Sequence, residues 1–137
     1  MNKSILVVEG EKKLRDKYRN ELEDVGYNVI TAGSGKKALH RLKNEPVDLI
    51  VADLVLPDGA GFAYLQEFMA VRRKVKVVIN TAHSAYKTDF HSWAADAFLT
   101  KSSDLSELKK TIYCVLYPKP PSKPPDKFTS SRYPLSK

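Results

Sequence analysis

Cysteine is almost absent from this chain, and so are long hydrophobic runs. Because Cys114 is the only cysteine, no internal disulfide can form, and we expect the protein in a reducing compartment, the cytoplasm. No unbroken apolar stretch approaches the length of about 18 residues that a membrane span needs, so we expect no membrane contact. Cys114 lies at helical spacing among Ile112 and Val115, which predicts that it is a small core residue.

Acidic residues are fewer than basic ones, and the imbalance is greatest near the carboxyl end. The net charge is +7, and residues 117–137 hold five basic side chains against one acidic. Six of the 8 prolines lie in the same segment, where they exclude a helix and match PxxP patterns typical of polyproline II. We therefore predict a domain over residues 1–116 and a disordered, Pro-rich basic tail over residues 117–137. Nucleic-acid binding by this tail is disfavoured.

Short β-branched runs alternate with amphipathic segments across the first 116 residues. The expected strands are Ile5–Val8, Tyr27–Thr31, Val47–Ala52, Val75–Ile79 and Ala97–Leu99. The expected helices are Lys12–Val25, Ser34–Asn44, Phe62–Arg73, His83–Trp93 and Asp104–Leu116. Such alternation predicts an α/β fold with parallel strands joined by right-handed crossovers. Since the first run is the most uniformly apolar, it belongs at the centre of a flavodoxin-like (βα)5 three-layer sandwich with strand order 2-1-3-4-5.

Local signals mark the ends of several helices. Gly26 has the position of a C-cap glycine after the first helix, and Ser34 can cap the second. Asp104 and Glu107 have the spacing of a capping box at the start of the last helix.

The most informative residue is Asp53, which follows the apolar run Val47–Ala52 and precedes a Pro/Gly turn. A run of this kind is typical of a strand buried on both faces, with its last residue at the carboxyl edge of the sheet. Open α/β folds bind their ligands at that edge. An isolated aspartate before a loop is more often a simple turn cap, so the meaning of Asp53 depends on its neighbours.

Three further polar residues follow strands that end at the same edge. Glu9 comes after the first strand, Thr81 after the fourth and Lys101 after the fifth. Alone, each is well explained as a loop acid, a helix cap or a surface charge. Together with Asp53 they bring an acid, a possible nucleophile, a hydroxyl and a cation to one edge from separate segments.

This combination is suited to accepting a phosphoryl group on Asp53, because a carboxylate can attack phosphorus in line to give an acyl phosphate. The transferred group needs positive charge beside it, from Lys101 and from a divalent metal. Mg²⁺ prefers oxygen ligands, and Glu9, Asp53 and the backbone carbonyl of Val55 are the candidate ligands. The hydroxyl of Thr81 could donate to a phosphoryl oxygen.

Four motifs resemble the receiver domain of two-component response regulators, the CheY-like superfamily, over about residues 3–116. The motifs are Ile5–Glu9, Asp53–Gly61, Val78–Ala82 and Phe98–Lys101. The resemblance implies a bacterial phosphorelay protein in which Asp53 is the phosphoacceptor and Lys101 pairs with the phosphoryl group. It also implies that Thr81 is the switch hydroxyl and Phe98 the switch aromatic residue.

The resemblance further implies the partners. A sensor histidine kinase or a phosphotransfer protein would be the donor, and a downstream protein would bind the face made by the fourth helix, fifth strand and fifth helix. A homodimer is a further option. The chain would be a regulatory domain and not an enzyme, catalysing at most its own phosphorylation from a donor. A tail of 21 residues is too short for an output domain, so we expect a stand-alone receiver or a piece of a longer protein.

Gly10 departs from the family pattern, which has a second acid after the first strand. Without that carboxylate, Mg²⁺ should bind weakly. The alternative function is therefore a pseudo-receiver, an interaction module that works without phosphorylation. A second departure is Ser102, which stands where the family has proline.

Enzymes of similar topology fit less well. Aspartate-nucleophile phosphatases carry a second acid two residues after the nucleophile, where this chain has Val55. A flavodoxin would need a Ser/Thr/Gly-rich phosphate loop after the first strand, and Glu9-Gly10-Glu11 is acidic there.

Overall fold

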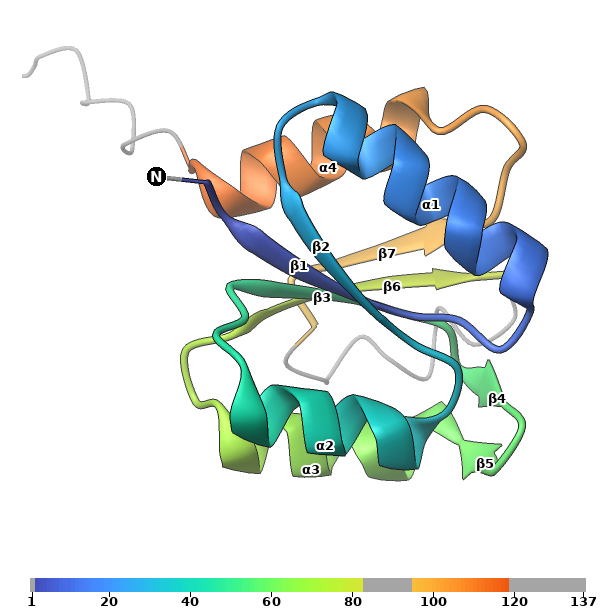
Figure 1. Ribbon diagram of the computed structural model, residues 1–137, viewed down its shortest axis with the longest axis vertical. Helices are drawn as coiled ribbons and strands as arrows, with labels where there is room; N and C mark the ends of the chain where they lie inside the picture. The colour runs from blue at the N-terminus through green and yellow to red at the C-terminus, as the bar shows by residue number, and fades with distance from the viewer. Residues whose placement is uncertain (1, 83–94, 119–137) are drawn as a thin grey trace, which may run out of the picture.

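The computed structural model describes residues 2–82 and 95–118. Five parallel strands form one sheet in the order β2-β1-β3-β6-β7 (Figure 1). Their bounds are Ser4–Val8 for β1, Asn28–Ala32 for β2, Leu49–Ala52 for β3, Lys76–Thr81 for β6 and Ala97–Thr100 for β7. The predicted flavodoxin-like order is confirmed, because β6 and β7 are the fourth and fifth strands of this sheet.

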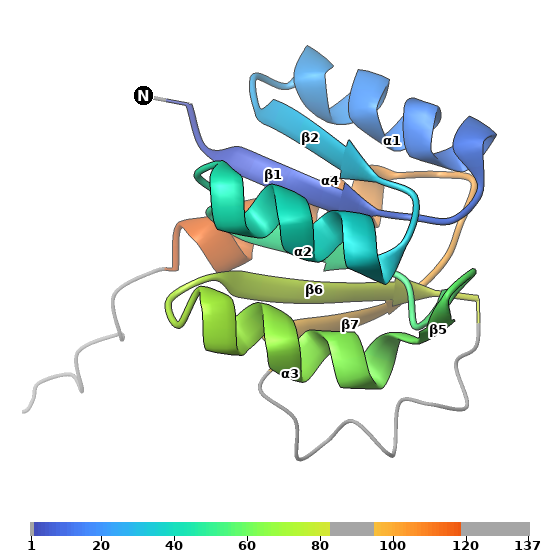
Figure 2. The same ribbon diagram turned by 60° about the horizontal axis from the view of Figure 1, so that its bottom comes forward.

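Helices cover both faces of the sheet and complete the three layers. α1 (Lys12–Asp24) and α4 (Ser106–Leu116) lie on one face, and α2 (Gly35–Asn44) and α3 (Gly61–Val71) lie on the other (Figures 1 and 2). No helix in residues 2–82 or 95–118 is long and apolar enough to cross a membrane.

β1 shows why the centre of the sheet is so apolar. Its residues from Ile5 to Val8 are at most 1% exposed. Leu6 and Val8 join the core cluster beneath α2 and α3, whereas Ile5 and Val7 join the cluster beneath α1 and α4. Because successive side chains of a strand point to opposite faces, a strand covered on both sides must be apolar at every position.

Helix ends follow the local sequence at two of the three predicted positions. Gly26 has a φ of 102° after α1, its amide donates to the carbonyl of Glu23, and the amide of Tyr27 donates to that of Leu22, which is a Schellman motif. The hydroxyl of Ser34 accepts from the amide of Lys37 at 3.2 Å, as predicted.

The prediction of a capping box at Asp104 and Glu107 is wrong. The N-cap of α4 is Leu105, which makes no side-chain cap. Asp104 Oδ1 accepts instead from the amide and the hydroxyl of Ser106, at 3.0 and 2.7 Å. Cys114 is also exposed rather than a core residue, because its side chain lies on the outer face of α4.

A small hairpin was not predicted. β4 (Val55–Leu56) and β5 (Gly59–Ala60) pair antiparallel directly after Asp53. The predicted helix His83–Trp93, with its histidines, and the tail beyond residue 118 lie outside the described residues.

Candidate functional site

Glu9, Asp53 and Lys101 each lie one residue beyond the end of a strand, and the sheet holds the backbone of all three. The amide of each continues the hydrogen-bond ladder to the neighbouring strand. The acceptors are the carbonyl oxygens of Ala32, Val8 and Thr81, at 3.1, 3.1 and 2.8 Å respectively. The register of the parallel strands therefore decides which side chains meet at this edge.

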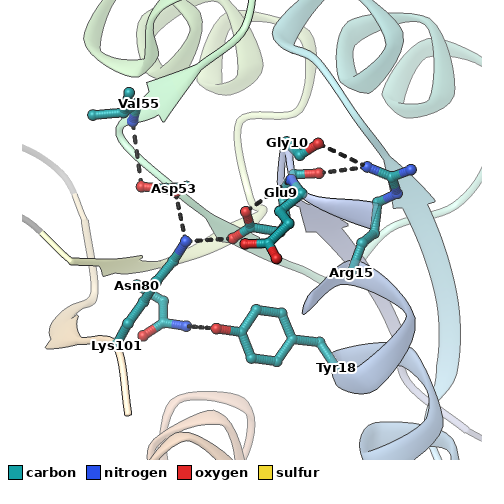
Figure 3. Close-up of polar contacts among 9 residues, drawn as sticks. Glu9, Gly10, Arg15, Tyr18, Asp53, Val55, Asn80 and Lys101 are labelled. Atoms are coloured by element: carbon teal, nitrogen blue, oxygen red, sulfur yellow. Dashed lines mark hydrogen bonds and ion pairs between the residues drawn. The ribbon is translucent and has the colours of Figure 1, made fainter. Parts of the chain in front are cut away.

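The ammonium of Lys101 joins the two carboxylates. Its Nζ lies 2.7 Å from Glu9 Oε1 and 2.8 Å from Asp53 Oδ2 (Figure 3). The Glu9 and Asp53 side chains are only 6% and 9% exposed, and that of Lys101 is 17% exposed. The prediction that these three residues converge is confirmed, and the two acids with one cation leave a surplus negative charge.

The remaining carboxylate oxygens are held by backbone amides. Glu9 Oε2 accepts from the amide of Glu11 at 3.1 Å, and Asp53 Oδ1 accepts from the amide of Val55 at 3.3 Å. Burial lowers the pKa of Lys101, but its hydrogen bonds to Asp53 and Glu9 raise it more, so the pKa lies above its ordinary value. The lysine therefore remains a cation at neutral pH.

Thr81 and Phe98 lie on the neighbouring strands. Thr81 ends β6 with no exposed surface and pairs in register with Thr100 of β7. Phe98 on β7 is partly buried and packs against the core cluster beneath α2 and α3. Thr81 is therefore at the carboxyl end of β6, at the same edge as Asp53, whereas Phe98 lies two residues before the end of β7.

Gly10 is covered by the hairpin. A β carbon built at Gly10 would lie 3.0 Å from Cδ and 3.1 Å from Cγ of Pro57. Real β carbons rarely approach another atom so closely, so any side chain at this position requires Pro57 to shift. A side chain at residue 10 therefore needs the Pro57 ring to give way by about a few tenths of an ångström.

Asp58 was missed by the sequence reasoning. Its Oδ1 accepts from the amide of Gly35 and its Oδ2 from that of Lys36, both at 3.0 Å, while the hydroxyl of Tyr64 donates to Oδ2 at 3.0 Å. The pKa of Asp58 is lowered, first by the Gly35 amide. Asp58 thus ties the hairpin to the start of α2. A turn aspartate is visible in the sequence, but its partner helix is not.

A buried polar pair next to the site was also missed. Asn80 Nδ2 donates to the hydroxyl of Tyr18 at 3.2 Å, and the side chains are 4% and 2% exposed (Figure 3). Burial raises the pKa of the Tyr18 phenol. The pair links α1 to β6 beneath the site.

The sequence matches the family model of the response regulator receiver domain over residues 5–113. The chain belongs to this family.

Curated relatives of this receiver domain include two transcriptional regulators. This chain is 31% identical over 118 residues to the alkaline phosphatase synthesis transcriptional regulatory protein PhoP of Bacillus subtilis. The match covers 85% of this chain and 49% of PhoP. This chain is also 31% identical over 113 residues to the transcriptional regulatory protein ZraR of Escherichia coli K12. That match covers 81% of this chain and 26% of ZraR. The chain therefore spans half or less of the length of these two relatives.

Solved structures of response regulators share the fold of this receiver domain. TrrA of Thermotoga maritima in complex with Mg²⁺ and BeF has a TM-score of 0.78 and 34% identity, covering 83% of this chain and 99% of TrrA. TrrA in complex with the histidine kinase ThkA has a TM-score of 0.76 and 34% identity. The match covers 83% of this chain and 98% of TrrA.

The donors of this receiver domain suit Mg²⁺ in chemical kind but are few. Glu9 and Asp53 offer carboxylate oxygens that converge on one point, and the Val55 carbonyl is the third candidate ligand. In residues 2–82 and 95–118, no three His, Cys, Asp or Glu side chains group into a metal site. The ammonium of Lys101 lies between the two carboxylates, so a metal ion would compete with it for their oxygens.

Proposed function

We propose that Asp53 accepts a phosphoryl group from a histidine kinase or a phosphotransfer protein. The observation that carries this proposal is the ion-paired group of Glu9, Asp53 and Lys101, with Nζ of Lys101 2.8 Å from Asp53 Oδ2. An Asp53 oxygen forms the new bond to phosphorus while the bond from phosphorus to the donor's histidine nitrogen breaks, and the electron pair of that bond stays on the nitrogen.

The other residues of the site have supporting roles in this proposal. Lys101 leaves one carboxylate oxygen of Asp53 and pairs with the new phosphoryl oxygens, because its raised pKa keeps it charged. The hydroxyl of Thr81 moves toward the phosphoryl group and donates to one of its oxygens. The side chain of Phe98 then turns inward. When Mg²⁺ is bound, held by Glu9, Asp53 and the Val55 carbonyl, it supplies further neutralising charge.

The output of this switch is a change in protein–protein contacts. β7 and α4 are the described part of the predicted output face, and Phe98 lies on β7. A change at Thr81 reaches this face directly, because the carbonyl of Thr81 accepts from the Lys101 amide that follows β7.

Intact-mass spectrometry tests the phosphoacceptor. The protein is incubated with Mg²⁺ and a small phosphodonor, and we expect the mass of one phosphoryl group to be added. Asp53→Asn should abolish the gain, whereas Asp24→Asn, a matched change at the exposed end of α1, should preserve it. No gain in the unchanged protein at high Mg²⁺ would contradict the proposal.

We also propose a second candidate, a pseudo-receiver that binds its partner without phosphorylation. It is supported by Gly10, which supplies no carboxylate, and by Pro57, whose Cδ would lie 3.0 Å from a β carbon at residue 10. Under this proposal the protein gains no phosphoryl mass, and a Gly10→Asp/Pro57→Ala variant does. Mass gain in the unchanged protein would exclude the second candidate.

A further inference from the structure

A cavity of about 580 Å³ lies between α1 and α2, at the carboxyl end of the edge strand β2. The two helices lie on opposite faces of the sheet and flank the open side of β2 (Figures 1 and 2). Thr31, Ala32 and Gly33 line it from the strand and the loop that follows. None of the residues that line this cavity belongs to the group of Glu9, Asp53 and Lys101.

The walls of this cavity are strongly basic. α1 contributes Arg15, and α2 contributes Lys36, Lys37, His40 and Arg41. The Arg41 guanidinium has a partner, Glu45 Oε2 at 2.7 Å. Within the described residues, no carboxylate forms an ion pair with Arg15, Lys36 or Lys37, although the Asp58 carboxylate accepts from the backbone amide of Lys36. No acidic side chain in residues 2–82 or 95–118 lines the cavity.

Arg15 is already oriented toward the cavity wall. Its Nη1 donates to the carbonyl oxygens of Glu9 at 2.8 Å and Gly10 at 3.4 Å (Figure 3). Its guanidinium also fits against Gly33, where an added β carbon would lie 2.9 Å from Nη1. A held guanidinium loses less rotational freedom on binding, and its planar donors match the geometry of phosphate.

We propose that this cavity binds a small organic ligand carrying two adjacent phosphates. Its volume lies within the range of about 300–1,000 Å³ typical of small-molecule sites. Arg15, Lys36 and Lys37 provide the charge for the phosphates. Thr31 and the aliphatic stems of the basic side chains line the part of the cavity that would hold the organic group.

The same site is linked to the phosphoacceptor edge by Arg15. Because its guanidinium holds the Glu9 and Gly10 carbonyls, a ligand that draws on Arg15 alters the backbone from which the Glu9 carboxylate extends toward Lys101. Ligand binding itself does not depend on phosphorylation of Asp53, so it can be measured without a phosphodonor.

Isothermal titration calorimetry of the full chain, at low ionic strength and without metal, tests the proposal. ADP and pyrophosphate are the probes and adenosine is the uncharged comparison. We expect saturable binding of one ADP and one pyrophosphate per chain and none of adenosine. Lys36→Glu/Lys37→Glu should weaken ADP binding about tenfold or more. Lys13→Glu/Lys43→Glu, the same charge change at exposed positions outside the cavity, should change it by about twofold at most.

Amide chemical shifts supply the second measurement. Pyrophosphate should shift the amides of Gly33, Lys37 and Glu9, and Arg15→Lys should reduce the shift at Glu9 while far-ultraviolet circular dichroism stays unchanged. Three results would each overturn the proposal: no binding of ADP or pyrophosphate, equal weakening in both double variants, or tighter binding of oligoglutamate than of ADP. The last would assign the cavity to an acidic peptide.

Discussion

Pro57 packs directly over Gly10, so that a β carbon at Gly10 would lie 3.0 Å from Cδ of the proline ring. The hairpin that follows Asp53 therefore borders the position where other receiver domains are expected to hold a second acid. Asp58 then fastens the hairpin to α2 through the Gly35 and Lys36 amides. The Pro57 ring therefore lies against residue 10 in a hairpin that Asp58 fastens to α2.

Gly10→Asp should destabilise the fold by about 1–3 kcal/mol, because the new side chain must displace the Pro57 ring. Pro57→Ala removes the Cγ and Cδ atoms that the new side chain meets, so the double variant should be more stable than the sum of the single changes predicts. Urea unfolding of all four proteins gives this coupling energy. Simple additivity would show that the two residues do not interfere.

Lys101→Met should lower the free energy of unfolding by about 3 kcal/mol, because it leaves two buried carboxylates without their cation. The matched control is Lys109→Met. Lys109 pairs with Glu21 at 2.6 Å, but these side chains are 31% and 41% exposed, so we expect a much smaller loss than in Lys101→Met. Equal losses in the two variants would contradict a special role for the buried ion pairs.

The same ion pairs should make the fold sensitive to alkaline pH. The folded pKa of Lys101 lies above its ordinary value of 10.5, so its stabilisation is complete below that pH and is lost as the pH rises through the folded pKa. Unfolding measured from about pH 9 to about pH 12 should show a smaller decline in Lys101→Met than in the unchanged protein. Since the raised pKa of Tyr18 acts in the same direction, both proteins should also be measured with Tyr18→Phe.

Asp58→Ala should cost about 1 kcal/mol at neutral pH, because α2 loses the carboxylate that accepts from two of its first amides. The lowered pKa of Asp58 means that this stabilisation is present above the ordinary pKa of 3.8 and is lost as the pH falls through the folded pKa. The difference in the free energy of unfolding between Asp58→Ala and the unchanged protein, measured by urea unfolding, should therefore become smaller at acidic pH.

Tyr64→Phe is the matched control for that experiment, since it removes only the hydroxyl that donates to Asp58. Tyr64→Phe should lower the free energy of unfolding by less than Asp58→Ala does. The comparison separates the hydrogen bond from the Tyr64 hydroxyl from the two hydrogen bonds donated by backbone amides of α2. Hydrogen exchange at Gly35 and Lys36 should accelerate in Asp58→Ala and hardly change in Tyr64→Phe. Unchanged exchange in Asp58→Ala would show that the caps contribute little.

Local patterns were sufficient for most of the fold. Apolar residues at every position of Ile5–Val8 predict a central strand, since only a strand covered on both faces needs them. Gly26 and Ser34 end and begin helices as expected, because their roles depend on neighbouring backbone atoms. The capping box at Asp104 failed because Ser106, two residues away, competed for the carboxylate.

The sequence by itself determined that Glu9, Asp53 and Lys101 follow strands that share one edge, since parallel strands leave their carboxyl ends together. Only the tertiary structure decided that one ammonium contacts both acids, that Pro57 covers Gly10 and that Asp58 caps α2. Those contacts join segments from 22 to 92 residues apart, and the register and packing of whole elements set their distances. No local pattern encodes such distances, whereas the alternation of strands and helices follows from apolar periodicity.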